Sequence, residues 1–432
     1  MVSPLRQVLI AFLVAAAATA HAAPVYEEEP IKYSDSTPHD PVAMLKDQLD
    51  QGKLKLECSP AHGYLESLLK HLNISPSSQT LVFSKTSFQR NRISPKNPRA
   101  LYFNDDVYVG YVPGGDLLEI ASTDPKLGTV FYTLHQRSSD QPLKILRQTD
   151  NCLQCHGESM TNDTPGLLIR SVFPDERGNP ILSAGTFLST HESPIKERWG
   201  GWYVTGKTAE PHLGNQRFTE RENQAPEPLG EDAKPDLSEY PKPTSDVVAL
   251  MVLEHQVEAH NRITRANYDA LRALRDEKIV ADAMGEKFKE GEHSESTLRR
   301  VAAGCEPLIQ YLLFSGETLL KGSVQCDPSF KADFTSKGPR DAKGRSLRDF
   351  DLKTRLFRHP CSYLIYSPAL DALPEIAQGY IQKKLYDILT GKDAGDAFKH
   401  LTPADRTAIL EILRDTKPTF RAAWEKLASS NK

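Results

Sequence analysis

The sequence predicts an α+β protein, with antiparallel strands in its N-terminal half and helices in its C-terminal half. Apolar residues alternate with a period of two in short segments between residues 107 and 188, which is the pattern of half-buried strands. After residue 243 they recur every three or four positions, which is the pattern of amphipathic helices. A chain of 432 residues is long enough for two or three domains of ~150 residues each.

The composition is that of an ordinary globular protein, with 39% hydrophobic residues, 25% charged residues and a formal net charge of −4. This balance argues against nucleic acid as a partner, because nucleic-acid-binding domains are basic. It gives no support for binding to a membrane surface either.

Residues 1–23 are expected to be a signal peptide. Arg6 precedes an apolar stretch at residues 8–18, and Ala20-His21-Ala22 forms a small-x-small cleavage site. The stretch is shorter than the ~20 residues that cross a bilayer, and no other segment approaches that length. We therefore expect an exported, periplasmic protein without an integral membrane span, rather than one held by an uncleaved anchor.

The first elements of the mature chain are short. Residues 24–40 are acidic and polar and are expected to form a mobile tail. Helices are predicted at residues 42–49 and 65–72 from their apolar spacing. A β-meander follows, and then a second hairpin after a break. The strands are expected at residues 107–111, 117–122, 129–134, 167–173 and 181–188.

Between the two β elements lies the run Cys152-Leu153-Gln154-Cys155-His156, a C-x-x-C-H motif. Each thiol can form a thioether to a haem vinyl group, and the histidine then lies beside the iron as its proximal ligand. With 6 Cys and 13 His in the chain, about 0.0025 accidental matches are expected. The motif therefore predicts one covalently bound haem c. Haem is attached in the export compartment, which agrees with the signal peptide.

Two other kinds of site use paired cysteines. A thioredoxin-like dithiol opens a helix after a strand in a βαβ unit and does not need His156. A structural zinc ion needs four ligands, but the sequence contains no second C-x-x-C. Its one suitably spaced histidine pair, His255 and His260, lies far downstream. Haem is the interpretation that uses all three residues of the motif.

The motif resembles that of single-haem c-type cytochromes. Together with its flanking strands, it resembles exported bacterial cytochrome-c-domain proteins of uncharacterised role, a likeness that implies haem and no further function. The topology around the motif is also similar to PAS-like haem sensor domains. The chain departs from small helical cytochromes, whose methionine ligand follows the motif by some tens of residues. No methionine lies between Met160 and Met251.

These observations divide the chain. An α+β haem-binding domain is expected at residues 41–217. Residues 218–243 are polar and proline-rich and are expected to form a linker or surface strap. Residues 244–432 are expected to form a helical domain. Its first helix is predicted to be capped by Thr244 or Ser245 and to run through Leu274, and Thr402-Pro403 is typical of another helix start.

The sixth ligand of the iron decides the function. A strong protein ligand makes an electron carrier, whereas an open position makes a gas sensor or a catalyst. His255 is the first candidate, because it shares a helix face with Met251 and because Glu258 is placed to hold its second nitrogen. His260 and Met251 are alternatives on the same predicted helix.

A second group of candidates surrounds the aromatic turn at residues 198–203. His191 and His212 stand on either side of this turn. Trp199 and Trp202 within it can pack against a haem edge or in any core. Each of the histidines can equally be an ordinary loop or core residue.

A run of basic residues precedes the meander. It can pair with haem propionates, steer an acidic redox partner, or form a solvated loop. The run consists of Lys85, Arg90, Arg92, Lys96 and Arg99.

Cysteines outside the motif indicate disulfides, because four thiols in an oxidising compartment form two bridges in one of three connectivities. Free buried thiols are the alternative. The cysteines are Cys58, Cys305, Cys326 and Cys361.

The leading hypothesis is an exported single-haem cytochrome that transfers one electron at a time to a redox partner protein. A haem-based redox or gas sensor is the second hypothesis, and a peroxidase-like haem enzyme is the third. The sequence contains no Ser-His-Asp set, phosphate loop or dinucleotide fingerprint, which favours a carrier over a catalyst. No feature indicates the oligomeric state or the identity of the partner.

Overall fold

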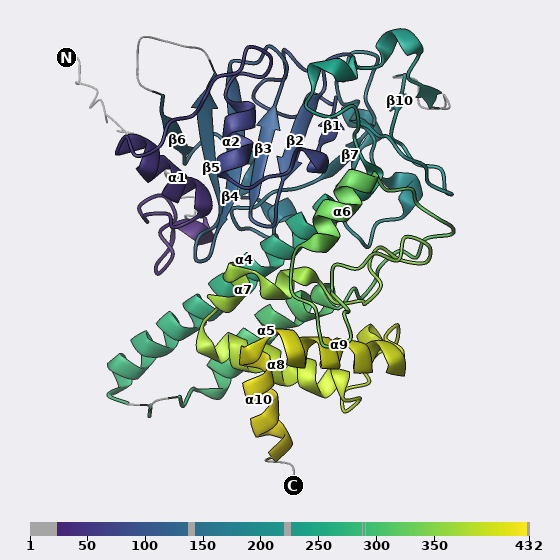
Figure 1. The fold of residues 1–432 in the computed structure, drawn as a ribbon. Helices are drawn as coiled ribbons and strands as arrows, with labels where there is room; N and C mark the ends of the chain where they lie inside the picture. Colours follow the sequence, from purple (N-terminus) through teal and green to yellow (C-terminus); the bar gives the residue numbers. More distant parts are fainter. Residues whose placement is uncertain (1–23, 137–142, 220–225, 287, 290, 430–432) are drawn as a thin grey trace, which may run out of the picture.

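The structure is a computed structural model that describes residues 24–136, 143–219, 226–286, 288–289 and 291–429 (Figure 1). The expected signal peptide lies outside the described residues. Within them, a seven-stranded antiparallel sheet occupies the N-terminal half and helices make up much of the C-terminal half. The predicted α+β class is confirmed.

The sheet is a meander in which neighbouring strands are neighbours in the sequence, with β9 added beside β1. Its order is β6-β5-β4-β3-β2-β1-β9. The strands predicted at residues 107–111, 117–122 and 129–134 correspond to β3, β4 and β5. The bounds are β1 (Thr80–Val82), β2 (Arg99–Phe103), β3 (Val107–Tyr111), β4 (Leu117–Asp124), β5 (Gly128–His135), β6 (Ile145–Gln148) and β9 (Trp202–Tyr203).

The predicted second hairpin is present in a shorter form outside this sheet, where β7 (Arg170–Val172) pairs antiparallel with β8 (Thr186–Leu188). Another ribbon consists of β10 (Gln216–Arg217) and β11 (Glu227–Pro228).

Different parts of the chain cover the two faces of the sheet. Successive residues of a strand point to opposite faces, and β5 illustrates both sides. The hydroxyl of Tyr132 donates a hydrogen bond to Asp40, which caps α1 (Pro41–Asp50). The neighbouring Phe131 packs against His156, with 5.1 Å between the ring centroids. Helix α1 and the C-x-x-C-H segment therefore lie on opposite faces. Helix α2 (Leu65–His71), also predicted, precedes the sheet.

The segment at residues 24–40 differs from the expected mobile tail, because it packs against the domain. Tyr33 is fully buried, and its hydroxyl donates to the carbonyl oxygen of Thr129 at 2.9 Å. The guanidinium of Arg147 donates to the carbonyl oxygen of Tyr33 at 2.6 Å. Tyr26 and Ile31 are buried as well. These apolar side chains, scattered among acidic residues, anchor the segment.

The described part of the proline-rich segment is a strap against the residues that precede β1 and β2, rather than a free linker. The hydroxyl of Tyr240 donates to the carbonyl oxygen of Pro98 at 2.8 Å. The side-chain amide of Gln79 donates to the carbonyl oxygens of Lys242 and Thr244 at 2.7 and 2.6 Å. The strap leads directly into α4 (Val247–Met284).

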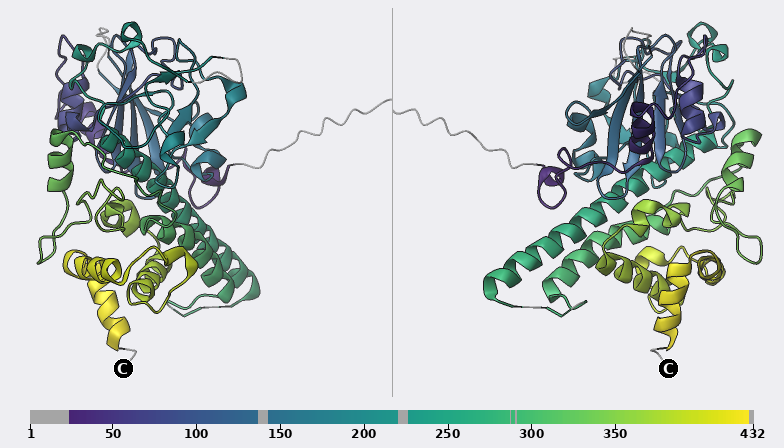
Figure 2. Two further views of the ribbon diagram at one scale, coloured as in Figure 1. Left: turned by 90° about the vertical axis from the view of Figure 1, so that its right-hand side faces the viewer. Right: turned by 60° about the vertical axis from the view of Figure 1, so that its left-hand side comes forward.

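Helix α4 belongs to both halves of the molecule. It has 38 residues and is therefore ~57 Å long at 1.5 Å per residue. Its first four turns are buried beneath the sheet, and its second half runs beside α5 (Glu295–Leu312), as Figures 1 and 2 show. Asp246 caps it by accepting a hydrogen bond from the Ala249 amide at 2.9 Å, in place of the predicted Thr244 or Ser245. It also continues ten residues beyond the predicted end at Leu274.

Helix α8 (Glu375–Leu389) packs against α5, and α9 (Pro403–Thr416) and α10 (Pro418–Ser429) pack against α8. Thr402 forms a capping box with Asp405 at the predicted start of α9. No helix in the described part of the chain is long and apolar enough to cross a membrane. The remaining helices are α6 (Pro328–Ser336) and α7 (Pro368–Asp371).

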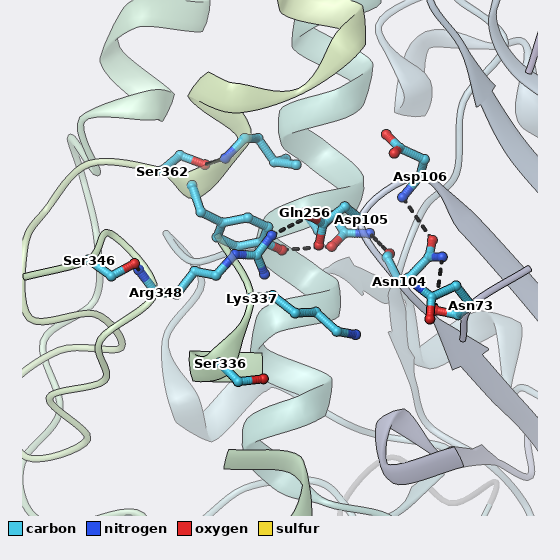
Figure 3. Close-up of polar contacts among 12 residues, drawn as sticks. Asn73, Asn104, Asp105, Asp106, Gln256, Ser336, Lys337, Ser346, Arg348 and Ser362 are labelled. Atoms are coloured by element: carbon cyan, nitrogen blue, oxygen red, sulfur yellow. Dashed lines mark hydrogen bonds and ion pairs between the residues drawn. The ribbon is translucent and has the colours of Figure 1, made fainter. Parts of the chain in front are cut away.

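The turn between β2 and β3 is bound to the helical half through Gln256 of α4 (Figure 3). The amide nitrogen of Gln256 donates to the carbonyl oxygen of Asn104 at 2.7 Å and to the hydroxyl of Tyr108 at 2.8 Å. Its amide oxygen accepts a hydrogen bond from the hydroxyl of Tyr363 at 2.6 Å. One buried side chain thus joins the sheet, α4 and the C-terminal segment.

Arg348 makes a second connection to the same turn. Its guanidinium forms an ion pair with Asp105 and lies over the rings of Tyr363 and Phe334, 4.3 and 4.8 Å from their centroids. His260 of α4 donates from Nε2 to the carbonyl oxygen of Asp105 at 2.8 Å. Because these contacts link residues far apart in the sequence, they hold the two halves in one arrangement.

The substitution Gln256→Leu is expected to lower the free energy of unfolding by about 2–4 kcal/mol, because buried partners of the amide lose their hydrogen bonds. Urea unfolding followed by circular dichroism measures this loss. Gln48→Leu on the exposed side of α1 is the matched control. Equal stability of the two variants would contradict a joining role for Gln256.

Candidate functional site

The C-x-x-C-H motif forms a single helical turn, α3 (Leu153–His156), with Cys152 at its N-cap. Residues three and four positions apart share a helix face, so Cys152, Cys155 and His156 lie on one side of the turn. Leu153 is buried on another side, in the core. Cys152 is half-buried, Cys155 is exposed, and both thiols are free. The turn therefore presents both thiols and the imidazole together.

The imidazole of His156 is held by a backbone carbonyl. Its Nδ1 lies 3.0 Å from the carbonyl oxygen of Gly166, and the Gly166 amide donates to the His156 carbonyl oxygen at 2.8 Å. Loss of solvent around the ring, which packs on Phe131, lowers the pKa of His156 to about 4. A neutral ring that donates from Nδ1 keeps Nε2 as an acceptor, and among the described residues Nε2 has no hydrogen-bond partner.

The loop that follows the motif is fastened to α4. The amide of Asn261 donates to the carbonyl oxygen of Leu167 at 2.7 Å, and Arg265 donates to that of Asn162 at 3.2 Å. A Cβ atom at Gly166 would lie 2.2 Å from the side-chain oxygen of Asn261, so only glycine permits this close approach. The carbonyl that orients His156 is thereby fixed in place.

This donor set fits a covalently bound iron porphyrin. Haem c needs two thiols and an imidazole nitrogen on one side of a turn, and α3 provides them. A ligating histidine usually donates its other N–H to a carbonyl or carboxylate, which sets the tautomer. Gly166 supplies that carbonyl for His156.

The structure does not bring His255, the first candidate for the distal ligand, to the motif. Its Nδ1 lies 2.8 Å from Nδ1 of His191, and its Nε2 lies 2.8 Å from the hydroxyl of Ser362. The ring is fully buried and stacked on Phe314 and Tyr311 at centroid distances of 4.4 and 5.3 Å. Both nitrogens are engaged, because this side of α4 faces α5 and the segment at residue 362.

Glu258, which was expected to hold the second nitrogen of His255, contacts other residues instead. Glu258 pairs with Arg262 at 2.7 Å and accepts a hydrogen bond from Asn162 of the motif loop at 3.4 Å. His191 therefore takes the place expected for Glu258 beside His255. The two histidines are 64 residues apart in the sequence, and no local pattern indicates that they meet.

The remaining candidate ligands have structural partners. His260 binds the Asp105 carbonyl, and Met251 lies in the core. His212 accepts a hydrogen bond from the Gly214 amide at 3.0 Å and packs edge-on against Trp199, which is fully buried. Trp202 faces the motif side and donates from its indole nitrogen to the Arg170 carbonyl oxygen at 2.9 Å. None of these contacts includes the motif itself.

A buried ion pair lies beside the histidine pair and was not singled out from the sequence. Arg198 and Glu254 are 3.1 Å apart, with side-chain exposures of 3% and 0%. Burial raises the pKa of Glu254 to about 7, against the opposing effect of the Arg198 charge. Arg198 also donates to the carbonyl oxygens of His191 and Ser193. The pair connects the aromatic turn to α4.

The expected disulfides are absent, because all six cysteines are free. Cys58 is exposed, whereas Cys305 and Cys361 are buried and Cys326 lies beside Asp246, 3.6 Å from its carboxylate. Burial raises the pKa of both Cys305 and Cys361 to about 12, which favours the thiol form. An even number of cysteines indicated pairing, but they occupy separate environments.

Searches against protein-family models, curated proteins and solved structures find no match to the chain. Among the described residues, no group of three or more His, Cys, Asp or Glu is arranged to hold a metal ion. The chemistry of the site therefore follows from the contacts around α3.

The buried histidine pair predicts acid sensitivity. Burial lowers the pKa of His255 to about 3, and burial together with His255 lowers that of His191. In the unfolded chain both histidines bind protons near their ordinary pKa of 6.5. The free energy of unfolding is therefore highest above pH 6.5 and falls as the pH drops towards 3. The expected loss at pH 5 is roughly 2 kcal/mol for His255, and His191 changes the stability in the same direction.

Urea unfolding at pH 8, 6.5 and 5 measures this loss. The variant His191→Leu/His255→Leu should be less stable at pH 8 and less dependent on pH. His71→Gln, at an exposed position on α2, should leave the profile of the native chain unchanged. A free energy of unfolding that stays constant down to pH 5 would refute the prediction.

Proposed function

We propose that this protein is an exported, periplasmic c-type cytochrome with one haem c, which transfers one electron at a time to a redox partner protein. Cys152 and Cys155 are the attachment residues, and His156 is the proximal ligand. The observation that carries the proposal is the joint presentation of both thiols and an oriented imidazole on α3. Haem iron supplies a one-electron couple when it is bound.

The residues around α3 have defined tasks in this proposal. Gly166 holds the Nδ1 proton of His156, so that Nε2 keeps its lone pair for the iron. The lowered pKa keeps the ring neutral at physiological pH, which is the state that binds metal. Phe131 and the sheet exclude water from one side of the ring. Asn261 stiffens the loop that carries the Gly166 carbonyl.

A haem-based sensor is the second candidate. The loop after the motif is bound to α4 through Asn162, Leu167 and Asn261, and α4 continues into the helical half. A change at the haem can therefore reach the helices through one rigid element. His255 remains a candidate distal ligand only if it releases His191 and Ser362, so the structure favours another occupant or an open position.

Haem attachment is tested by expression with cytochrome c maturation machinery. The native chain should remain red after acid-acetone extraction and should give the pyridine haemochrome spectrum of haem c. Cys152→Ser/Cys155→Ser should be colourless, because no thioether can form. Cys58→Ser/Cys326→Ser is the matched control and should stay red. A colourless native protein would end the proposal.

The carrier and the sensor differ in the sixth coordination position. The carrier predicts a low-spin, six-coordinate ferrous spectrum that CO leaves unchanged, and His255→Ala tests that residue directly. The sensor predicts a CO-binding iron and a change in the rate of proteolysis within residues 218–243 when CO is added. Equal cleavage with and without CO would count against the sensor.

A further inference from the structure

A cluster of charged side chains lies on the sheet face that carries the motif. Arg99 of β2 and Glu119 of β4 form an ion pair at 2.6 Å, with side-chain exposures of 19% and 16%. Yet Nε of Arg99, Oε1 of Glu119 and Nε of Arg170 are buried, and none has a hydrogen-bond partner among the described residues. Buried donors and acceptors are costly to leave unpaired, and more so when they are charged.

These groups face the motif. Arg99 and Glu119 form their ion pair across β3, so both side chains lie on one face of the sheet. Trp202 pairs with Val82, which also pairs with Arg99, and the indole of Trp202 binds the Arg170 carbonyl oxygen from that face. In the strand register, Glu119 pairs with Thr133, two residues from Phe131 on the same face. Arg99 and Glu119 are therefore on the side where the porphyrin is proposed to be held, and Arg170 lies beside this face.

The sheet and the second hairpin position the two arginines. Gly110 of β3 lies between Arg99 and Glu119, where an added Cβ would be 3.5 and 3.4 Å from their side chains. The absent side chain leaves room for Arg99 and Glu119 to meet across β3. Arg170 belongs to β7, and its carbonyl oxygen is bound by the indole of Trp202 on β9. The two guanidinium groups thus come from separate, fixed elements.

The ligand chemistry follows from the charges. Two guanidinium groups, each with a free Nε donor, suit two carboxylates, since guanidinium binds carboxylate in a bidentate way. A haem carries two such groups as its propionates. Of the basic run at residues 85–99, Arg99 lies on the sheet, whereas Arg92 pairs with Asp116 at the surface.

We propose that Arg99 and Arg170 bind the two propionates of the haem attached at Cys152 and Cys155, with Glu119 as the counter-charge between Arg99 and the iron site. This inference rests on the proposed function. It makes the arginines positioning residues and makes Glu119 a determinant of the midpoint potential. Two guanidinium groups, one carboxylate and two propionates sum to one negative charge, which ferric haem neutralises. The site therefore favours the oxidised state.

The test uses the full-length, haem-loaded protein and two readouts, the midpoint potential and the resonance Raman bending band of the propionates. Removing a positive charge disfavours reduction, so Arg170→Gln should lower the potential. Removing a negative charge favours reduction, so Glu119→Gln should raise it. Each change is expected to alter the ferrous-to-ferric ratio about tenfold, or ~59 mV for a one-electron couple.

The propionate contact itself is read from the Raman band. Arg170→Gln and Arg99→Gln should each shift the band, and Arg170→Lys should restore the potential but not the band, because lysine keeps the charge and loses the planar pair of donors. Arg177→Gln in the exposed turn between β7 and β8, with 77% side-chain exposure, is the matched control and should change neither readout.

The outcomes separate this inference from the function on which it rests. A colourless native protein would overturn both. A red protein whose band and potential are the same in the native chain and in Arg170→Gln would overturn the propionate assignment and leave the cytochrome proposal intact. Shifts of the same sign in Arg170→Gln and Glu119→Gln would also overturn it, because a purely structural disturbance has no reason to follow the sign of the removed charge.

Discussion

The burial of the first four turns of α4 against the sheet is the constraint on which the rest of the structure depends. Every residue from Val247 to Asn261 is buried, so the helix has no solvent-exposed face over this stretch. Each side of the helix therefore contacts a different part of the molecule. Gln256 meets the β2–β3 turn, His255 meets His191 and Ser362, and Asn261 meets the motif loop. One helix thereby sets the relation between the sheet, the candidate site and the helical half.

The candidate site combines a rigid part and an incomplete part. The rigid part is the clamp between His156 and Gly166, which is held from behind by Asn261. The incomplete part is the surface opposite, where Arg99 and Glu119 of the sheet and Arg170 of β7 each keep a buried atom without a partner among the described residues. Native proteins seldom leave such atoms unpaired. The propionates of the proposed haem would supply acceptors for the two unpaired Nε donors, and the charges of this surface would then act on the iron.

The long-range contacts also explain why one half of the chain does not stand apart from the other. The hydrophobic core runs from the N-terminal segment at Tyr26 through α4 to Trp424 without interruption. The strap at residues 226–243 packs against the residues that precede β1 and β2 instead of separating two bodies. A haem bound at the motif, as proposed, would report to the helices through packed contacts along α4 rather than through a hinge.

The sequence by itself determined the class of fold, the positions of β3 to β5, the capped start of α9 and the set of two thiols and an imidazole in the C-x-x-C-H motif. Each of these features depends only on residues that are close together in the sequence. The strands follow from a period of two, the helices from a period of 3.6, the helix start from its capping residue, and the motif from five adjacent residues. Tertiary structure alone decided which way the histidines of α4 point, that residues 24–40 pack, and that the four other cysteines stay apart. It also placed Arg99, the last residue of the basic run, on strand β2 of the sheet. Such outcomes depend on which distant surface each side chain meets, and a helix buried on all sides gives no periodicity from which that surface can be read.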